Sequence, residues 1–417
     1  MTGVRDPVGT DGRQRAYTGG DDLKPDTCHL TPAVSVTPSA RALAVLLACA
    51  AGCDGATDIP ILPSPPPPIT VPDGFAVEVY ASGLDLPTSI AFPPDGSDRL
   101  FVNELQSGTV WIIQNGDMRD EPFARLETNT AGGFPVEGEN GLLGIAFDPQ
   151  YAVNRYVYVT YATRTETDTL GSVARFTDVN GVGEDFTVLL DGIPSAVGHQ
   201  VESLAFGPDG MLYVSTGDAF VADEVQNTDS FVGKILRMTP DGGVPPDNPF
   251  PGSYTYAYGF RNAFDLVFDG TGTLYATDNG PERDDELNLV TAGGNYGWPM
   301  ALGETTSPDL VSPLHVWPMI VAPGGMAFYE ATQFPASYRG KLLLVLFGDT
   351  FSMGPSDRAK RVQLVDLTST PPVLEDFAVY DFTGMGNPLD VAVGPDGSVF
   401  LTDIFQGRIF RISYVGG

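Results

Sequence analysis

A short apolar run followed by a tight turn recurs six times along this chain, and the repeat limits the fold more than any other feature. The six runs end at Phe92, Phe147, Phe206, Phe268, Phe328 and Val393. The intervals between these residues are 55, 59, 62, 60 and 65 residues. A turn rich in Pro, Asp and Gly follows most copies, and a second apolar run comes after it. Six such repeats, each long enough for further strands, predict an all-β chain folded as a six-bladed β-propeller.

The innermost strand of each blade should be the first apolar run, such as 204–206, and we expect it to be apolar on both faces because it lines a packed centre. The last repeat holds only three strand-like segments, at 390–393, 399–403 and 408–414. Residues 75–80 can supply the fourth strand and close the ring, which removes two exposed edges. An array of β-sandwiches is the alternative, and six copies in equal phase argue against it.

Charge and cysteine usage exclude several classes of function. Lys and Arg number 22 against 53 Asp and Glu, so the formal net charge is −31. That charge repels phosphate backbones and anionic lipid surfaces, so we expect no nucleic-acid partner. The three cysteines, Cys28, Cys49 and Cys53, all lie near the start. The rest of the chain can therefore form neither a disulfide framework nor a cysteine-ligated metal site.

The first part of the chain reads as targeting sequence. Residues 1–53 are predicted to be a leader with a signal peptide, because the apolar stretch 42–51 is too short to span a bilayer. Ala-Ala-Gly-Cys53 resembles a bacterial lipobox, with Cys49 as a second candidate for a lipid anchor, and a plain cleaved secretion signal is the alternative. Residues 54–71 are predicted to be a Pro-rich linker and 72–417 the propeller. We expect the protein to be located in the cell envelope, either periplasmic or secreted. Anchoring in the membrane as a lipoprotein is part of this expectation.

Polar residues in the third and fourth repeats are predicted to meet at the propeller face opposite the Pro-Asp-Gly turns. His199 precedes the first strand of its repeat, and Asp218 follows the second strand. Arg261 and Gly280-Pro281 hold the same two places in the next repeat. A histidine beside a carboxylate can act as a base on a hydroxyl, because the carboxylate fixes its tautomer. Arg261 adds a fixed positive charge for a substrate oxygen. A structural His–Asp pair and a simple Arg–Asp salt bridge are the alternatives.

The segment from Gly280 to Glu286 is a second candidate site. A Gly-Pro turn can present two adjacent carbonyl oxygens, and a run of acidic residues follows it. Hard oxygen ligands of this kind suit Ca²⁺ better than zinc or copper. The alternative is a solvated acidic loop.

Several motifs together resemble the soluble PQQ (pyrroloquinoline quinone)-dependent glucose/sorbosone dehydrogenases, the aldose sugar dehydrogenases. The resemblance covers roughly residues 72–415 and is most specific in the third and fourth repeats. The motifs are Glu139-Asn-Gly-Leu-Leu-Gly-Ile-Ala-Phe147, Gly198-His-Gln200, Gly217-Asp218, Phe260-Arg-Asn262, Asn279-Gly-Pro-Glu-Arg-Asp-Asp-Glu-Leu-Asn288, Gly293-Gly-Asn-Tyr-Gly-Trp-Pro299 and Val316-Trp-Pro318.

The resemblance implies that PQQ binds on the top face of the propeller. His199 would be the general base on a sugar hydroxyl, Asp218 its orienting partner and Arg261 an electrophilic contact. The residues that the resemblance places around the cofactor are Glu139, His199, Arg261, Asn262 and Trp317.

The same resemblance implies two calcium sites. The carbonyl oxygens of Gly280 and Pro281 would hold a Ca²⁺ that also touches the quinone and polarises it. Asp285 or Glu286, with the carbonyl oxygen of Tyr296, would fit a second, structural Ca²⁺.

The sequence departs from the glucose-oxidising members of the family at one end of the cofactor. Those members grip the carboxylates of PQQ with Lys and Arg side chains from blades 5 and 6. Asp349, Asn387 and Leu389 stand at the aligned positions here. The loss of charge-assisted partners should weaken cofactor binding by several kcal/mol in sum.

We therefore expect an oxidoreductase that acts on an aldose or a related hydroxyl compound and passes electrons to an external quinone or cytochrome. The alternative is a non-catalytic, calcium-stabilised propeller that binds sugar or protein ligands. A calcium-dependent propeller lactonase is a third reading. The carbonyl motif at Gly280-Pro281 argues against it, because such enzymes usually hold their metal with side-chain carboxylates in the central channel.

Overall fold

The structure is a computed structural model of the 417-residue chain, and it describes residues 69–126, 139–164, 168–348, 360–380 and 386–416. The predicted leader at 1–53 lies outside the described residues, as does most of the linker predicted at 54–71. Contacts separate residues 1–63 from a second unit, 64–417, which holds all the described elements. Within the described ranges, no helix combines the length and apolar character that a membrane span requires.

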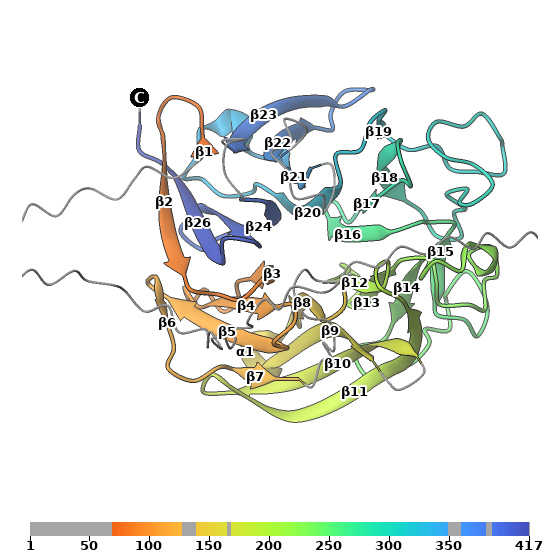
Figure 1. Ribbon diagram of the computed structural model, residues 1–417, viewed down its shortest axis with the longest axis horizontal. Coiled ribbons are helices and arrows are strands. Elements are labelled where there is room, and N and C mark those ends of the chain that lie inside the picture. Colours follow the sequence, from red (N-terminus) through yellow and green to blue (C-terminus); the bar gives the residue numbers. More distant parts are fainter. Residues whose placement is uncertain (1–68, 127–138, 165–167, 349–359, 381–385, 417) are drawn as a thin grey trace, which may run out of the picture. The chain divides into compact units, whose positions relative to one another are not determined.

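The described strands form six sheets around a common centre (Figure 1), which confirms the predicted six-bladed β-propeller. Every strand pair in the sheets is antiparallel, and each blade follows the previous one in chain order. The innermost strands β3, β8, β12, β16, β20 and β24 each contact the next one, and β24 contacts β3, so the ring is closed.

The blades have the following strands. Blade 1 has β3 (Pro87–Ala91), β4 (Leu100–Glu104), β5 (Thr109–Gln114), β6 (Asp117–Met118) and β7 (Ala124–Arg125). Blade 2 has β8 (Leu142–Phe147), β9 (Tyr156–Arg164), β10 (Thr169–Val179) and β11 (Val182–Ser195). Blade 3 has β12 (Val201–Phe206), β13 (Leu212–Thr216), β14 (Lys234–Met238) and β15 (Thr255–Tyr258).

Blade 4 has β16 (Ala263–Phe268), β17 (Leu274–Asp278), β18 (Asp285–Val290) and β19 (His315–Trp317). Blade 5 has β20 (Pro323–Phe328), β21 (Leu342–Leu346), β22 (Arg361–Asp366), β23 (Val373–Tyr380) and the added β1 (Ile69–Thr70). Blade 6 has β24 (Pro388–Val393), β25 (Val399–Asp403), β26 (Arg408–Tyr414) and β2 (Phe75–Ser82). The short helical elements are α1 (Tyr151–Asn154), η1 (Ala222–Glu224) and η2 (Ala336–Tyr338).

The ring closes as the sequence predicted. β2, from the start of the propeller, pairs along β26 from Phe75 opposite Tyr414 to Ser82 opposite Arg408. The structure adds one strand before β2 that the sequence did not suggest. Ile69 and Thr70 form β1 on the outer edge of blade 5, where Ile69 is buried in the hydrophobic core.

The innermost strands differ from their prediction in one respect. Each pairs with its neighbour through a register shift near its middle, the mark of a β-bulge. The strands were expected to be apolar on both faces, but Glu202, Asp265 and Asp390 lie on three of them and are enclosed near the axis. The centre is therefore polar in part, and the six-fold apolar pattern did not reveal it.

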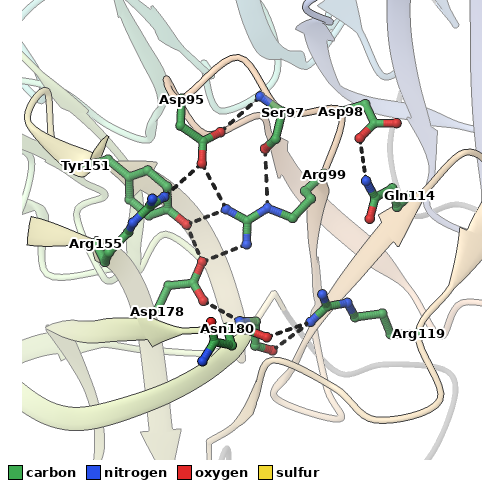
Figure 2. Close-up of polar contacts among 11 residues, drawn as sticks. Asp95, Ser97, Asp98, Arg99, Gln114, Arg119, Tyr151, Arg155, Asp178 and Asn180 are labelled. Atoms are coloured by element: carbon green, nitrogen blue, oxygen red, sulfur yellow. Dashed lines mark hydrogen bonds and ion pairs between the residues drawn. The ribbon is translucent and has the colours of Figure 1, made fainter. Parts of the chain in front are cut away.

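The Pro-Asp-Gly turns take part in structural polar networks (Figure 2). The guanidinium of Arg99 donates to Asp95 in the turn of blade 1 at 3.1 Å and to Asp178 of blade 2 at 2.8 Å. It also donates to the hydroxyl of Tyr151, and Arg155 donates to Asp95. Burial, with the Asp178 carboxylate, raises the pKa of Tyr151 to about 12. These contacts join blades 1 and 2 at the end of the strands remote from the predicted site.

Candidate active site

Loops at the opposite end of the strands surround a cavity of about 220 Å³. Seven of the residues predicted for the site line it: Glu139, His199, Arg261, Asn262, Gly280, Pro281 and Asp285. Asn279 completes this polar side. Much of the remaining wall is apolar and comes from blades 5, 6, 1 and 2, with Leu86, Leu105, Leu143, Phe347, Leu389, Ile404 and Phe405.

His199 is held in place from several directions. Its Nδ1 lies 2.7 Å from Oδ1 of Asp218, and its backbone N–H donates to the Glu139 carboxylate at 3.2 Å. The residue has φ of 57°, a left-handed conformation that is uncommon for histidine. Gly217 makes this conformation possible, because a Cβ there would lie 2.5 Å from the Cα of His199. Since Nδ1 is engaged, Nε2 is the ring nitrogen left for a ligand in the cavity.

Asp218 lies behind His199 and is 2 % exposed. Burial by itself would raise the pKa of Asp218. Hydrogen bonds from His199, from the Phe220 N–H and from the Trp298 indole outweigh burial and lower that pKa below its ordinary value. The carboxylate therefore stays ionised and accepts a hydrogen bond from the Nδ1–H group of His199, which fixes the histidine tautomer.

Trp298 is a site residue to which the sequence assigned no role. Its indole N–H donates to Oδ2 of Asp218 at 2.9 Å, and its ring lies 5.7 Å from the guanidinium carbon of Arg261. The only sequence signal was its membership of the Gly293–Pro299 motif. Eighty residues separate Trp298 from Asp218, so only the packing of blades 3 and 4 brings them together.

Arg261 contacts one of the two carbonyl groups that were predicted to bind calcium, that of Gly280. Its Nη1 donates to the carbonyl oxygens of Asn279 and Gly280, at 2.8 Å each. Its backbone N–H donates to Asp278 at 3.0 Å. Burial, together with the charge of Glu286, raises the pKa of Asp278 well above its ordinary value. The guanidinium is thus placed at the polar wall by the main chain of the fourth blade.

The polar wall offers oxygen atoms that suit a hard cation. The side-chain oxygens of Asn262 and Asn279 are buried without a hydrogen-bond partner, and both residues line the cavity beside the Gly280 carbonyl. Such oxygens are the ligands that Ca²⁺ prefers. The carboxylate of Asp285 has a different task, because it accepts the N–H groups of Gly280, Val321 and Ala322. It ties the Gly-Pro turn to the loop before β20.

Of the residues predicted for a second calcium, Asp285 lines the cavity, whereas Glu286 and Tyr296 lie outside its lining. The Glu286 carboxylate accepts the Gly303 N–H at 2.8 Å and the Asn288 amide at 3.0 Å. Burial raises its pKa to about 7. Tyr296 stacks on Phe260 with ring centroids 4.3 Å apart. Across the part of the chain that the structure describes, no three His, Cys, Asp or Glu side chains converge in a metal-binding group.

The remaining predicted cofactor contact, Trp317, is not among the residues that line the cavity. It is 7 % exposed and packs in the core with Leu287 and Met326. The Asn387 side chain donates to the Phe347 carbonyl at 3.0 Å, and Leu389 belongs to the apolar wall. Asp349 lies outside the described residues. Among the described residues of the lining, Arg261 is the one permanent cation.

These features divide the cavity into two halves. The half built by blades 3 and 4 fits a planar quinone and a calcium ion, because it offers a histidine, a guanidinium and amide and carbonyl oxygen atoms. The apolar half provides an aromatic and aliphatic wall and, within the described ranges, no cation to pair with carboxylates. The residues present therefore fit the reactive end of PQQ.

Comparisons with known proteins agree with this geometry. The family model "Glucose / Sorbosone dehydrogenase" matches residues 84–411. Aldose sugar dehydrogenase YliI of Escherichia coli is 27 % identical over 364 residues, which cover 81 % of this chain and 92 % of that protein. Quinoprotein glucose dehydrogenase B of Acinetobacter calcoaceticus is 31 % identical over 263 residues, which cover 55 % of this chain and 54 % of that protein.

A solved structure gives the same result. The PQQ-bound aldose sugar dehydrogenase of Streptomyces coelicolor superposes with a TM-score of 0.67 at 29 % identity, covering 82 % of this chain and 99 % of that one. The resemblance seen in the sequence motifs is thereby confirmed. The chain belongs to the glucose/sorbosone dehydrogenase family.

Proposed function

We propose that the protein is a PQQ-dependent dehydrogenase that oxidises an aldose or a related hydroxyl compound. The observation that carries the proposal is the His199–Asp218 pair at 2.7 Å, with His199 in the lining of the same cavity as Arg261 and the Gly280 carbonyl. The three proteins compared above support this reading over a non-catalytic binding module, because two are named as sugar-oxidising dehydrogenases and the third is a PQQ-bound aldose sugar dehydrogenase.

The chemistry of the chain follows from the fixed tautomer of His199. The Nδ1–H group of His199 donates a hydrogen bond to Asp218, so the proton stays on Nδ1, and Nε2 keeps a free lone pair that can take the proton of a substrate hydroxyl. The carboxylate then stabilises the imidazolium that forms. Arg261 orients the substrate or cofactor oxygen at the polar wall. PQQ, when bound, supplies the quinone that accepts the hydride equivalent from the substrate carbon.

The same proposal assigns the groups that would hold calcium and the cofactor. The Gly280 and Pro281 carbonyl oxygens would bind Ca²⁺, with the unpartnered amide oxygens of Asn262 and Asn279 within the same wall. Because Arg261 donates to Gly280, the cation and the guanidinium must share that oxygen. Asp285 would keep the turn in place.

The proposal extends to partners and location. An external quinone or cytochrome would accept the electrons. A cell-envelope location, periplasmic or secreted and with a lipid anchor at Cys53 or Cys49, follows from the leader sequence at residues 1–53.

The test compares two histidine variants in protein supplied with PQQ and Ca²⁺. His199→Gln should lower dye-linked sugar oxidation by about 10²–10⁴-fold, since it removes a positioned base. It should leave the quinone absorbance of the bound cofactor unchanged. His315→Gln is the matched control and should keep full activity, because His315 lies outside the cavity lining. Full turnover by His199→Gln would reject the mechanism. A PQQ-loaded wild type that oxidises none of the aldoses, aldehydes and polyols offered would favour the binding module.

A further inference from the structure

A second, much smaller cavity of about 20 Å³ lies on the axis of the propeller. It is a neighbour of the large cavity, because the two share the lining residues Thr88, Leu143, Phe264 and Leu389. Its other lining residues are Ser89, Gly144, Glu202, Ser203, Asp265, Gly325 and Asp390. Its volume is enough for a single water-sized species. Three carboxylates and three hydroxyl groups in such a small space are unusual for the interior of a protein.

Asp265 and Asp390 are fixed by the bulges of the innermost strands. Oδ2 of Asp265 accepts the N–H of Met326 on blade 5, and Oδ2 of Asp390 accepts the N–H of Ile90 on blade 1 at 2.8 Å. Asp390 also accepts the N–H of Val391 through Oδ1. Each carboxylate therefore links its own blade to the next one.

Hydroxyl groups and a glycine complete the surroundings of this pair. Ser203 and Ser89 line the same cavity, and their hydroxyl groups act to lower the pKa of Asp265 and of Asp390, respectively. Gly325 lies at the equivalent place on the blade between them. A Cβ at Gly325 would lie 2.1 Å from Oδ1 of Asp390, so only glycine leaves the Asp390 carboxylate its present position.

Glu202 provides an independent sign that this cavity is a ligand site. It is 2 % exposed, and its Oε1 accepts the Gln200 N–H at 3.2 Å. Its Oε2 has no hydrogen-bond partner. An unpartnered carboxylate oxygen in the interior is costly unless a cation or a proton compensates it. Glu202 lines the small cavity and not the large one.

We propose that the axial cavity binds one divalent cation of the Ca²⁺ class between Asp265 and Asp390, with the hydroxyls of Ser89 and Ser203 and with Glu202 as its further oxygen donors. All of these are hard oxygen ligands, which Ca²⁺ takes at about 2.3–2.6 Å. The three carboxylates do not converge in the present arrangement, so Glu202 reaches the cation through a water or a rotamer change. The cation ties blades 4 and 6 together beneath the floor of the large cavity.

The electrostatics of the two aspartates favours a cation at this place. Burial raises the pKa of Asp265 to about 8, with a further contribution from the charge of Asp390, and burial raises the pKa of Asp390 to about 6. Two enclosed like charges cannot both ionise at low cost without a cation. Calcium binding should therefore displace protons from the pair.

The first experiment measures calcium stoichiometry on the full chain after chelation with EGTA, with no PQQ added. Titration calorimetry with Ca²⁺ alone should show one fewer bound ion in Asp265→Asn and in Asp390→Asn than in the wild type. Asp117→Asn is the matched control, because Asp117 is exposed on β6, and it should bind the same number as the wild type. Equal stoichiometry in all four proteins overturns the proposal.

The second experiment does not depend on whether the variants fold. Crystals of the wild type grown with Mn²⁺ should show anomalous density between Asp265 and Asp390, separate from any density at the Gly280 carbonyl. Absence of the axial peak overturns the proposal. A second result would also overturn the proposal: the stability of the EGTA-treated protein falls as pH rises and does not change when Ca²⁺ is added. In that case a proton shared by Asp265 and Asp390, and not a cation, would compensate their charge. Failure of the histidine test above would leave both axial experiments unaffected.

Discussion

Trp298 connects two parts of the cavity wall that belong to different blades, and its role can be tested by a single substitution. Trp298→Phe removes the indole N–H that binds Asp218 while keeping an aromatic ring near Arg261. A hydrogen bond to a charged group contributes about 1.5–3 kcal/mol. We expect a loss of that size in the free energy of unfolding at pH 7, and a fall in turnover with little change in KM.

The pH dependence distinguishes this role from simple packing. The pKa of Asp218 is lowered in the folded protein, so its stabilising contribution is present above the unfolded pKa and is lost as pH falls through the folded pKa. Urea unfolding curves of wild type and Trp298→Phe should therefore converge toward acid pH. Trp111→Phe is the control, because the Trp111 indole N–H is buried without a partner. A stability difference that persists at low pH would mean that Trp298 acts through packing alone.

Among individual residues, the sequence predicted the site residues that lie within one motif. It did not predict the residues whose place depends on how the blades pack together. His199, Arg261, Gly280 and Pro281 line one cavity, and the repeat had placed them on one face, because His199 matches Arg261 and Asp218 matches Gly280 in successive hairpins. Glu202 belongs to an apolar strand pattern, so its enclosure on the axis could not be read from the sequence. Glu202 lines the axial cavity because its strand, β12, has a β-bulge between Val201 and Leu204. The periodicity of apolar residues does not indicate where such a bulge lies.

Among the elements, the loop between β13 and β14 carries Asp218 and depends on a buried lysine. Lys234 is 0 % exposed, and its Nζ donates to the carbonyl oxygens of Val225 and Val232 at 2.7 and 2.6 Å. Lys234→Met would leave both carbonyl groups unpaired, at a cost of about 1–3 kcal/mol each. We expect lower stability and faster hydrogen exchange in the loop from 217 to 233.

Lys234 also predicts a pH effect of known sign. Burial lowers its pKa to about 7, well below the value of an unfolded lysine. Between these two values the unfolded chain binds more protons, so the stability of the wild type should rise as pH increases from 7 toward 10. In Lys234→Met this rise should be reduced, which guanidinium unfolding at pH 7 and pH 9 would measure. An unchanged slope would show that the lysine is not the group that titrates.

The element pattern was the most predictable level of the structure. Five of the six predicted anchors are the last residues of innermost strands, and Phe92 directly follows β3. Strand β1 was missed because two residues after a proline run carry no periodic signal. Its pairing with β23 depends on an edge that exists only in the folded blade.

The closure of the propeller depends on the pairing of β2 with β26, because β2 completes blade 6 and leads directly into blade 1. Phe75, at the start of β2, contacts the rings of Phe334, Tyr338 and Phe377 in blade 5 and of Tyr414 in β26, with centroids 4.7–5.3 Å apart. The Phe75 side chain therefore contributes both to ring closure and to the packing of blade 5 against blade 6. Loss of this contact opens two sheet edges together.

Phe75→Ala should consequently lower the stability of the entire propeller. Phe→Ala substitutions in cores cost about 3–5 kcal/mol, and because Phe75 is half-buried we expect about 3 kcal/mol. Urea unfolding should remain a single transition at a lower midpoint, with hydrogen-exchange protection reduced in β24–β26 and in β3 and β4. Phe186→Ala is the matched control, because Phe186 is 48 % exposed on the outer strand of blade 2 and no chain end depends on it, so its cost should stay below about 1 kcal/mol. If hydrogen exchange increased in β2 alone while the midpoint of urea unfolding stayed unchanged, the blades would be stable without ring closure. The contacts of Phe75 would then have only a local effect.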